Sequence, residues 1–255
     1  MEKVELYQSE IEKLRPFEGE MLRQIKDFYK VGVTYSSNAL EGNSLTESET
    51  KVLLEDGLTV GGKPMREIYE AVDHGKAYEY MFGLLHSHEI TEENIKELHR
   101  LFYRNIDGAH AGVYRDFDVI ITGSKYPTSA HSEIAKEMEE LCKWMENERS
   151  NYHSVEFAAK LHKEFIFIHP FKDGNGRVAR LLVNTVLIQD GYLPIVIPPI
   201  LRHDYISSLE KAHRDDRDFT RFIIEREEES QKDILRLFHI PLPKLSENQK
   251  GMKML

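Results

Sequence analysis

The sequence predicts an all-α fold with a single β-hairpin. Most of the chain places apolar residues at the three- and four-residue spacing of amphipathic helices. Short polar turns with recognisable helix-capping residues separate these segments. Residues 113–130 differ, because β-branched residues lie on both sides of the pair Gly123-Ser124. That pattern is typical of two strands joined by a tight turn.

The helices can be placed in chain order. Residues 8–31 have helical periodicity that Pro16 breaks or kinks, and Thr46 to Glu49 forms a capping box for a helix that Gly57 ends. Thr91 caps a helix that ends near Asp107. Further helices are predicted over residues 65–85, 131–148, 154–168, 175–190, 203–214 and 217–238, and a loose tail over residues 240–255.

Composition limits the classes of function. The 255 residues are 40% hydrophobic and 31% charged, which fits one compact domain with an appendage or two small domains. The formal net charge of −10 disfavours binding to a nucleic-acid backbone, which depends on Lys and Arg. No basic helix suited to reading a DNA groove is present either. We therefore expect no nucleic-acid partner.

The chain shows no sign of secretion or membrane insertion. Cys142 is the only cysteine, so an intramolecular disulfide is excluded, and its helical setting indicates a packed small side chain. The N-terminus has no apolar stretch of the signal-peptide kind. Residues 193–201 are apolar but too short for a membrane span. We expect a cytoplasmic protein.

The segment His169-Pro-Phe-Lys-Asp-Gly-Asn-Gly-Arg-Val-Ala-Arg180 carries the most chemical information. It connects the end of one apolar helix to the start of another through a turn with two glycines, Gly174 and Gly176. Glycines that lead into a helix leave backbone N–H groups free to bind an anion. Arg177 and Arg180 share one face of the first helical turn and can bind phosphate.

Two further side chains complete this site. Asp173 offers a hard oxygen ligand for Mg²⁺, and His169 has a side chain suited to accept a proton near neutral pH. Each feature alone has an ordinary structural explanation, such as a simple turn or a solvated pair of arginines. Their occurrence in this order within one segment predicts a nucleotide-transfer site. No P-loop and no dinucleotide-binding glycine pattern is present.

The segment resembles the Fic-family signature HPFx(D/E)GNGRxxR at every specified position. The resemblance extends to a GxYR element at residues 112–115 and to the order of elements between residues 36 and 222. It implies a Fic-type helical bundle in which the hairpin is a flap over the active site. It also implies transfer of AMP from ATP to a hydroxyl side chain of a target protein, with Mg²⁺ bound and pyrophosphate leaving.

The resemblance assigns roles to individual residues. His169 would be the general base, Asp173 would hold Mg²⁺, and Phe171 would pack inward. The backbone of Gly174, Asn175 and Gly176, together with the Asn175 side chain, would form an anion hole for the phosphates. Arg177 and Arg180 would bind the outer phosphates. Relatives with Ala and Lys in place of Gly174 and Gly176 act as kinases, and this sequence does not match them.

Two parts of the nucleotide site are expected outside the motif. The flap would dock the target segment as an added strand, with Thr122, Gly123, Ser124 and Lys125 at its tip beside the nucleotide. An ordinary surface hairpin is the alternative. Residues where relatives enclose adenine and ribose correspond to Tyr205, Leu209 and His213. Their helical spacing is equally consistent with a core stripe.

Residues 37–42 match the family's inhibition pattern (S/T)xxxE(G/N). In this interpretation Glu41 pairs with Arg180 and removes a phosphate clamp, Ser37 fixes the segment, and Gly42 completes the pattern. The alternative is a glutamate at a helix end followed by a glycine cap. In some relatives the equivalent glutamate also assists removal of AMP, and the sequence leaves that activity open.

The expected organisation is a helical extension over residues 1–35, a Fic domain over 36–225, and a helix end and tail over 226–255. Self-modification is expected, and a homodimer is consistent with the apolar N-terminal helices. Two other functions remain open at this point. They are transfer of a different nucleotide or phosphate-linked group, and regulatory binding of ATP or a partner without turnover.

Overall fold

The computed structural model describes residues 1–59 and 61–244. This part of the chain contains ten α-helices joined by loops and three short 3₁₀ turns. The α-helices are α1 (Glu2–Glu12), α2 (Gly19–Ala39), α3 (Glu47–Glu55), α4 (Met65–Gly83), α5 (Glu92–Tyr103), α6 (Ile134–Glu148), α7 (Ser154–Ile168), α8 (Asn175–Gln189), α9 (Arg202–Lys211) and α10 (Arg217–Leu237).

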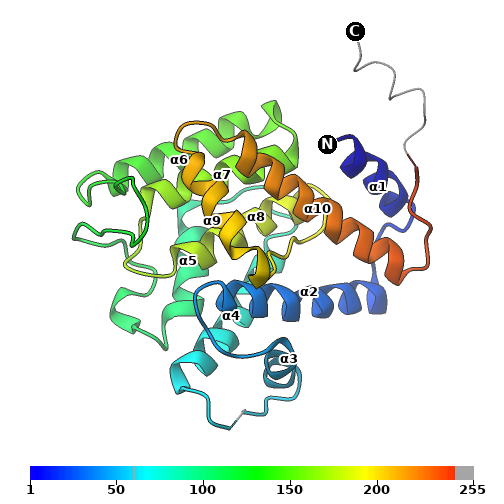
Figure 1. Cartoon of the computed structure of the whole chain (residues 1–255), viewed down its shortest axis with the longest axis horizontal. Helices are drawn as coiled ribbons and strands as arrows, with labels where there is room; N and C mark the ends of the chain where they lie inside the picture. The colour runs from blue at the N-terminus through cyan, green and yellow to red at the C-terminus, as the bar shows by residue number, and fades with distance from the viewer. Residues whose placement is uncertain (60, 245–255) are drawn as a thin grey trace.

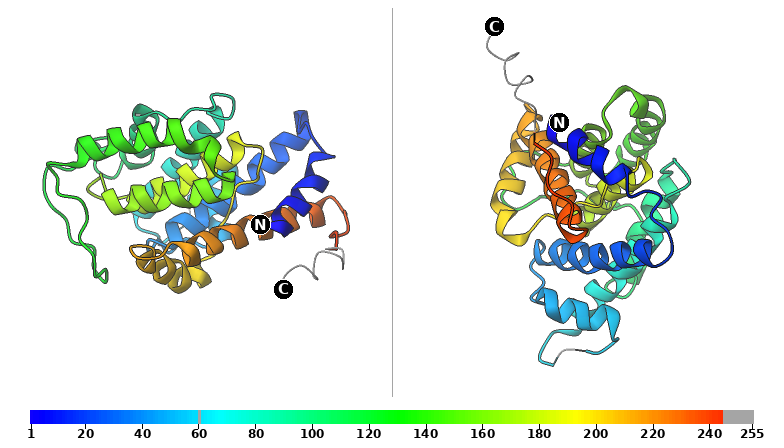
Figure 2. Two further views of the ribbon diagram at one scale, coloured as in Figure 1. Left: turned by 90° about the horizontal axis from the view of Figure 1, so that it is seen from above. Right: turned by 90° about the vertical axis from the view of Figure 1, so that its right-hand side faces the viewer.

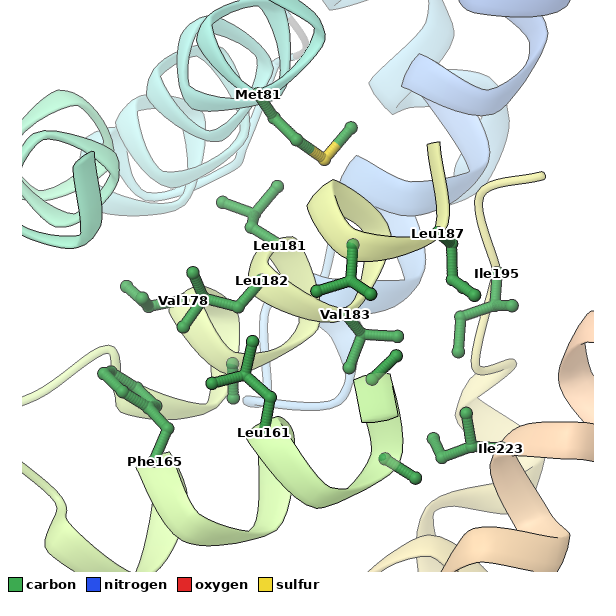
Figure 3. Packing of buried hydrophobic residues seen from close by; sticks show 14 of the residues in the cluster. Met81, Leu161, Phe165, Val178, Leu181, Leu182, Val183, Leu187, Ile195 and Ile223 are labelled. Carbon is green, nitrogen blue, oxygen red and sulfur yellow. The ribbon is translucent and has the colours of Figure 1, made fainter. Parts of the chain in front are cut away.

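Helix α8 lies at the centre of the fold (Figure 1). Almost all of its residues are buried, so it is a helix that must be surrounded by others. Figure 3 shows Leu181, Leu182 and Val183 of this helix among side chains of its neighbours, such as Leu161 of α7 and Ile223 of α10. The tight packing fixes α8 and therefore fixes the loop that leads into its N-terminus.

The N-terminal helices reach the central helix from outside. Helix α1 packs along α10, whereas α2 runs across the body of the protein (Figures 1 and 2). Helix α3 and the start of α4 project from the body around a second small apolar cluster of Leu45, Leu53, Ile68 and Ala71. The connection between α2 and α3, residues 40–46, thereby comes close to the start of α8.

The predicted all-α architecture is confirmed, and most helix limits agree with the structure. The capping box of Thr46 and Glu49 forms as predicted, and Thr91 caps α5. Helix α5 ends at Tyr103, earlier than the sequence indicated. Cys142 lies in α6, where burial raises the pKa of its thiol to about 11. The predicted tail falls mostly on residues 245–255, which lie outside the described residues.

The predicted β-hairpin is wrong. Within the part of the chain that the structure describes there is no strand, and the only β-type pairing is a single bridge between Tyr114 and Phe171. The guanidinium of Arg115 lies between the two arms of the segment and donates to the carbonyl oxygens of Phe117 and Ser129. These acceptors are satisfied by a side chain, so the arms form a loop and not a ladder.

Glu227 of α10 makes the free energy of unfolding depend on pH. Its side chain is fully buried, and this burial raises the pKa to about 8, whereas the ordinary value is 4.5. Between these pH values the unfolded state loses a proton that the folded state keeps. Unfolding therefore becomes easier as pH rises from about 4.5 to 8, by up to about 1.4 kcal/mol per pH unit. We expect Glu227→Gln to stabilise the protein by about 2 kcal/mol or more at pH 8 and hardly at all at pH 5, in urea unfolding.

The neighbouring Glu228 is a matched control for this prediction. Partial burial opposes its ionisation, but hydrogen bonds from Lys232 and Lys3 lower its pKa below the ordinary value. Glu228→Gln should therefore give no stabilisation at pH 8. Equal stabilisation by Glu227→Gln at pH 5 and pH 8 would contradict the assignment of the raised pKa to Glu227.

No helix in residues 1–59 and 61–244 combines the length and apolar character required to cross a membrane.

Candidate active site

His169 ends α7 in a left-handed conformation, with φ 54° and ψ 57°. This backbone is unfavourable for a residue with a side chain, so neighbouring contacts must hold it. The carbonyl oxygen of His169 accepts a hydrogen bond from Arg115 Nε at 2.9 Å. Arg115 is buried and thus fixes both this turn and the loop 117–130. The sequence had placed Arg115 in a family element without giving it a role.

The imidazole of His169 is held in its neutral form. Burial lowers its pKa to about 4, so the ring carries no charge at pH 7. Its Nδ1 lies 3.4 Å from the carbonyl oxygen of Ile166. A proton on Nδ1 directed at that oxygen leaves the lone pair of Nε2 free to accept a proton.

The loop after His169 is built on a buried aromatic stack. Phe171 is fully buried and lies parallel to the ring of His99, with ring centroids 3.9 Å apart. The Asn175 side chain accepts from the N–H of Phe171 at 2.9 Å and donates to its carbonyl oxygen at 2.8 Å. The inward packing predicted for Phe171 is therefore present. The amide of Asn175 is directed into the loop, where it fixes the turn.

His99 of α5 supports the same loop and was not singled out from the sequence. Its Nδ1 accepts a hydrogen bond from the N–H of Gly112 at 2.8 Å, so Nε2 carries the proton and donates to the carbonyl oxygen of Asp173 at 3.0 Å. Burial lowers the pKa of His99 to about 4, which keeps this tautomer neutral. No local motif marks a histidine of this kind in a sequence.

Gly174 starts α8 at a point where only glycine fits. Its φ is +81°, and a Cβ there would lie 2.3 Å from Cζ of Phe102. We expect Gly174→Ala to lower the free energy of unfolding by about 3 kcal/mol, from left-handed strain plus steric overlap. Gly123 is a control with φ +91° and open space around it, so Gly123→Ala should cost only about 1 kcal/mol. Equal losses in urea unfolding would contradict the steric argument.

The carboxylate of Glu41 lies at the N-terminus of α8. A Cβ on Gly176 would come within 2.4 Å of Glu41 Oε1, which shows how closely the carboxylate approaches this turn. A helix N-terminus favours negative charge because its first N–H groups have no partners in the helix. Glu41 therefore takes a position that suits a phosphate oxygen.

Arg180 joins this carboxylate to the end of α2. Its Nη2 donates to Glu41 Oε1 at 2.7 Å and to the carbonyl oxygen of Ser37 at 2.9 Å, while its Nε donates to Ser37 Oγ at 2.9 Å. Partial desolvation opposes ionisation of Glu41, whose side chain is 38% accessible, but the positive charge of Arg180 lowers its pKa below the ordinary value. Gly42 has a φ of +98° and ends the turn after α2. The glycine cap that was the alternative interpretation is therefore present in addition to the ion pair.

Arg177 is buried beside the same turn. Its guanidinium lies 4.5 Å above the ring of Phe102 and pairs with Glu70 Oε1 at 3.3 Å. Its Nε atom is buried without a hydrogen-bond or ion-pair partner among the residues that the structure describes. Donors of this kind are suited to an incoming polar group. Asp173 is more open and pairs with Arg66 at 3.2 Å.

The residues expected around adenine divide into two groups. Tyr205 and Leu209 are buried in the core, which favours the core-stripe alternative, and the hydroxyl of Tyr205 lies 3.4 Å from Arg180 Nη1. His213 is half-buried, with its ring between those of Tyr126 and Phe167 at centroid distances of 3.9 and 3.6 Å.

The tip of the loop 117–130 is held against α9. Glu210 accepts hydrogen bonds from Ser124 Oγ at 2.9 Å and from the N–H of Lys125 at 2.7 Å. Thr122 and Gly123 precede these contacts and make a turn closed by a bond from the Ser124 N–H to the Ile121 carbonyl. The structure brings this tip to α9, although not as the hairpin that was predicted.

Comparison with known proteins places this fold and motif in a family. The model of the Fic/DOC family matches residues 89–187, which include the loop from His169 to Arg180. The chain therefore contains a Fic/DOC family domain over these residues.

Two relatives that match most of this chain are named protein adenylyltransferases. The protein adenylyltransferase Fic of Nematostella vectensis is 37% identical over 207 residues, which are 80% of this chain and 48% of that protein. The protein adenylyltransferase fic-1 of Caenorhabditis briggsae is 32% identical over 213 residues, 82% of this chain and 41% of that protein. The chain thus spans about half, or less, of the curated relatives it matches.

Solved structures confirm the similarity of the fold over nearly the whole chain. A Fic domain containing signaling protein from Bacteroides thetaiotaomicron is 29% identical with a TM-score of 0.86, covering 94% of this chain and 100% of that chain. Fic-1 from C. elegans is 28% identical with a TM-score of 0.83, covering 93% of this chain and 72% of that chain.

Proposed function

We propose that this protein is a protein adenylyltransferase that transfers AMP from ATP to a hydroxyl side chain of a target protein. The observation that carries the proposal is the position of the Glu41 carboxylate, which lies against the N-terminus of α8 and is bound by Arg180. An anion is thus held where the motif would bind phosphate. The names of the two curated relatives support the same reaction.

The chain's own residues supply the parts that such a reaction requires. His169 Nε2 accepts the proton of the target hydroxyl as its oxygen attacks the α-phosphorus of ATP, and pyrophosphate leaves. The first N–H groups of α8 bind phosphate oxygens, and Arg177 and Arg180 neutralise the outer phosphates. Positioning and charge stabilisation provide most of the rate in transfers of this kind.

Asp173 fits a role as a magnesium ligand. It is a partly exposed carboxylate, 44% accessible, beside the expected phosphate position. The described residues contain no cluster of three or more His, Cys, Asp or Glu side chains that could hold a metal by itself. Magnesium typically binds through one or two carboxylates together with substrate phosphates and water, which this arrangement permits. Bound Mg²⁺ would neutralise charge on the phosphates.

The ion pair between Glu41 and Arg180 supports autoinhibition. While Arg180 is bound to Glu41 and Ser37, it cannot bind the terminal phosphate of ATP. The α-phosphate would then be misaligned for attack by the hydroxyl. Release of the segment 37–42 is therefore the step that would switch the enzyme on.

The remaining parts of the proposal concern surroundings and partners. The loop 117–130 carries exposed apolar side chains, Phe117 and Ile120, that suit docking of an extended target segment. The proposal also includes self-modification of the protein and a cytoplasmic location. A homodimer is consistent with exposed apolar residues on the N-terminal helices, namely Phe28, Val52, Met65 and Tyr69.

Intact-protein mass after incubation with a nucleotide and MgCl₂ tests the reaction. The protein would be supplied with ATP, GTP, CTP or UTP in parallel, using the Glu41→Gly variant to remove the inhibitory carboxylate. An AMP-sized addition with ATP, accompanied by pyrophosphate, is the expected product. A phosphate-sized addition would instead show a kinase. Tight ATP binding without a covalent product on the chain or on proteins of a lysate would support a nucleotide-sensing module.

A further inference from the structure

We propose that Arg66 is an internal counter-ion of Asp173 and must leave that carboxylate before a divalent cation can bind there. The inference rests on the proposed function, in which Asp173 is a magnesium ligand. It adds a second restraint on the site that acts on the metal position, whereas Glu41 acts on the phosphate position.

The contacts of Asp173 show that both of its oxygens are engaged. Arg66, in the first turn of α4, donates from Nη2 to Asp173 Oδ2 at 3.2 Å. The other oxygen, Oδ1, accepts from the N–H of Gly174 at 2.6 Å. A magnesium ion needs a carboxylate oxygen at about 2.0–2.1 Å, and a guanidinium on the same carboxylate would repel it.

The ion pair between Arg66 and Asp173 can be displaced easily. The side chains of Arg66 and Asp173 are 60% and 44% accessible to solvent, so water screens their attraction. Exposed ion pairs of this type are weak and readily displaced. Arg66 therefore weakens cation binding at Asp173 but does not prevent it.

The charges around Asp173 explain why the cation would arrive with the nucleotide. Arg66 also pairs with Glu70 Oε1 at 3.2 Å, and the same oxygen pairs with Arg177 at 3.3 Å. The cluster of Arg66, Glu70, Asp173 and Arg177 contains two positive and two negative side chains. It is neutral as a whole and gives a free divalent cation little attraction until phosphates bring further negative charge.

Glu70 also connects this cluster to the inhibitory segment. Its Oε2 accepts a hydrogen bond from Asn43 Nδ2 at 3.0 Å, and Asn43 follows Glu41 and Gly42 in the chain. The backbone carbonyl of Glu70 is bonded in addition by Asn38 Nδ2 at 3.3 Å. Helix α4 thus contacts both Asp173, through Arg66, and the inhibitory segment, through Glu70.

Binding of Mn²⁺ in the absence of nucleotide, followed by electron paramagnetic resonance of the free ion, tests the inference. Removal of the counter-ion in Arg66→Ala should tighten Mn²⁺ binding by about threefold to tenfold. Arg66→Lys should restore most of the weak binding of the unmodified chain. The matched control is Lys172→Ala, which removes a charge next to Asp173 in the chain while its contact is with Asp107 at 3.0 Å. It should change the affinity by less than about twofold.

Asp173→Ala separates failure of this inference from failure of the metal site itself. If Asp173→Ala weakens Mn²⁺ binding but Arg66→Ala leaves the affinity unchanged, Arg66 is not a counter-ion to the metal. Equal tightening by Arg66→Ala and Lys172→Ala would show a general charge effect and would also overturn the proposal. If Asp173→Ala leaves Mn²⁺ binding unaltered in the Arg66→Ala background, the proposed metal role of Asp173 falls as well. Thermal unfolding of each variant checks that it is folded.

Discussion

Replacing Glu41 by glycine is expected to raise AMP transfer from ATP by at least about tenfold, the effect of roughly 1.4 kcal/mol in favour of the competent state. The physical reason is the ion pair of 2.7 Å between Glu41 and Arg180, together with the carboxylate that lies against Gly176. Without this side chain, both the guanidinium and the N-terminus of α8 become available to phosphate. Intact-protein mass with ATP and MgCl₂, read as a rate of AMP addition, measures the change.

Two variants make this result specific. Glu41→Gln keeps a weak acceptor for Arg180 but removes the charge, so its rate should lie between the rates of the wild type and Glu41→Gly. Glu47→Gln removes the same charge from the first turn of α3, on an exposed side chain, and should leave the rate unchanged. A rate in Glu41→Gly equal to that of the wild type, with the variant folded and ATP bound, would refute autoinhibition by Glu41.

Replacing His169 by alanine in the Glu41→Gly background is expected to lower AMP transfer by about 10²- to 10⁴-fold, the usual contribution of a general base. The ring is neutral at pH 7 because burial lowers its pKa to about 4, so loss of the base and not of a charge causes the effect. The same pKa predicts that the rate is independent of the ionisation of His169 above about pH 5.

Nucleotide binding distinguishes loss of the base from loss of the site. The affinity of a non-hydrolysable ATP analogue should change by less than about threefold in Glu41→Gly/His169→Ala, because His169 takes part only in the transition state. A full rate of AMP transfer in that double variant would exclude His169 as the base. A parallel loss of nucleotide affinity would assign His169 a structural role in the turn that Arg115 holds.

Much of the site could be predicted because its parts are contiguous in the chain. The glycines at 174 and 176 and the arginines at 177 and 180 follow one another within a helix start, where local geometry alone decides which groups face the same side. Helix limits such as the cap at Thr46 were predictable for the same reason, since capping depends on a few neighbouring residues.

Other parts of the site depend on contacts between distant segments. Arg66 and His99 support the loop from outside the motif, and no local pattern distinguishes them from other polar residues on helices. Arg115 belongs to the GxYR element, but that element does not indicate its contact with His169. Burial of Tyr205 was undecided, because helical spacing shows which residues share a face but not what covers that face. These contacts form only when α4 and α5 pack against α8 and α9 packs against α10.

The loop 117–130 shows the same division. Its β-branched residues indicated strands, yet strand formation requires a partner backbone at the correct distance. Arg115 instead occupies the space between the arms and bonds their carbonyl oxygens. Composition could identify an extended segment, but it could not show that side chains such as Arg115 bond its carbonyl oxygens at residues 117 and 129.

The sequence by itself determined the all-α architecture, the glycine-rich start of α8 and the chemical identity of its side chains, because these depend on periodicity and near neighbours. Only the tertiary structure decided which distant groups meet at that helix start. It brings Glu41 to Arg180, which lies 139 residues away in the chain, and Arg66 to Asp173, which lies 107 residues away. Contacts over such separations follow from the burial of α8 among its neighbours, which fixes where α2 ends and where α4 begins beside its N-terminus.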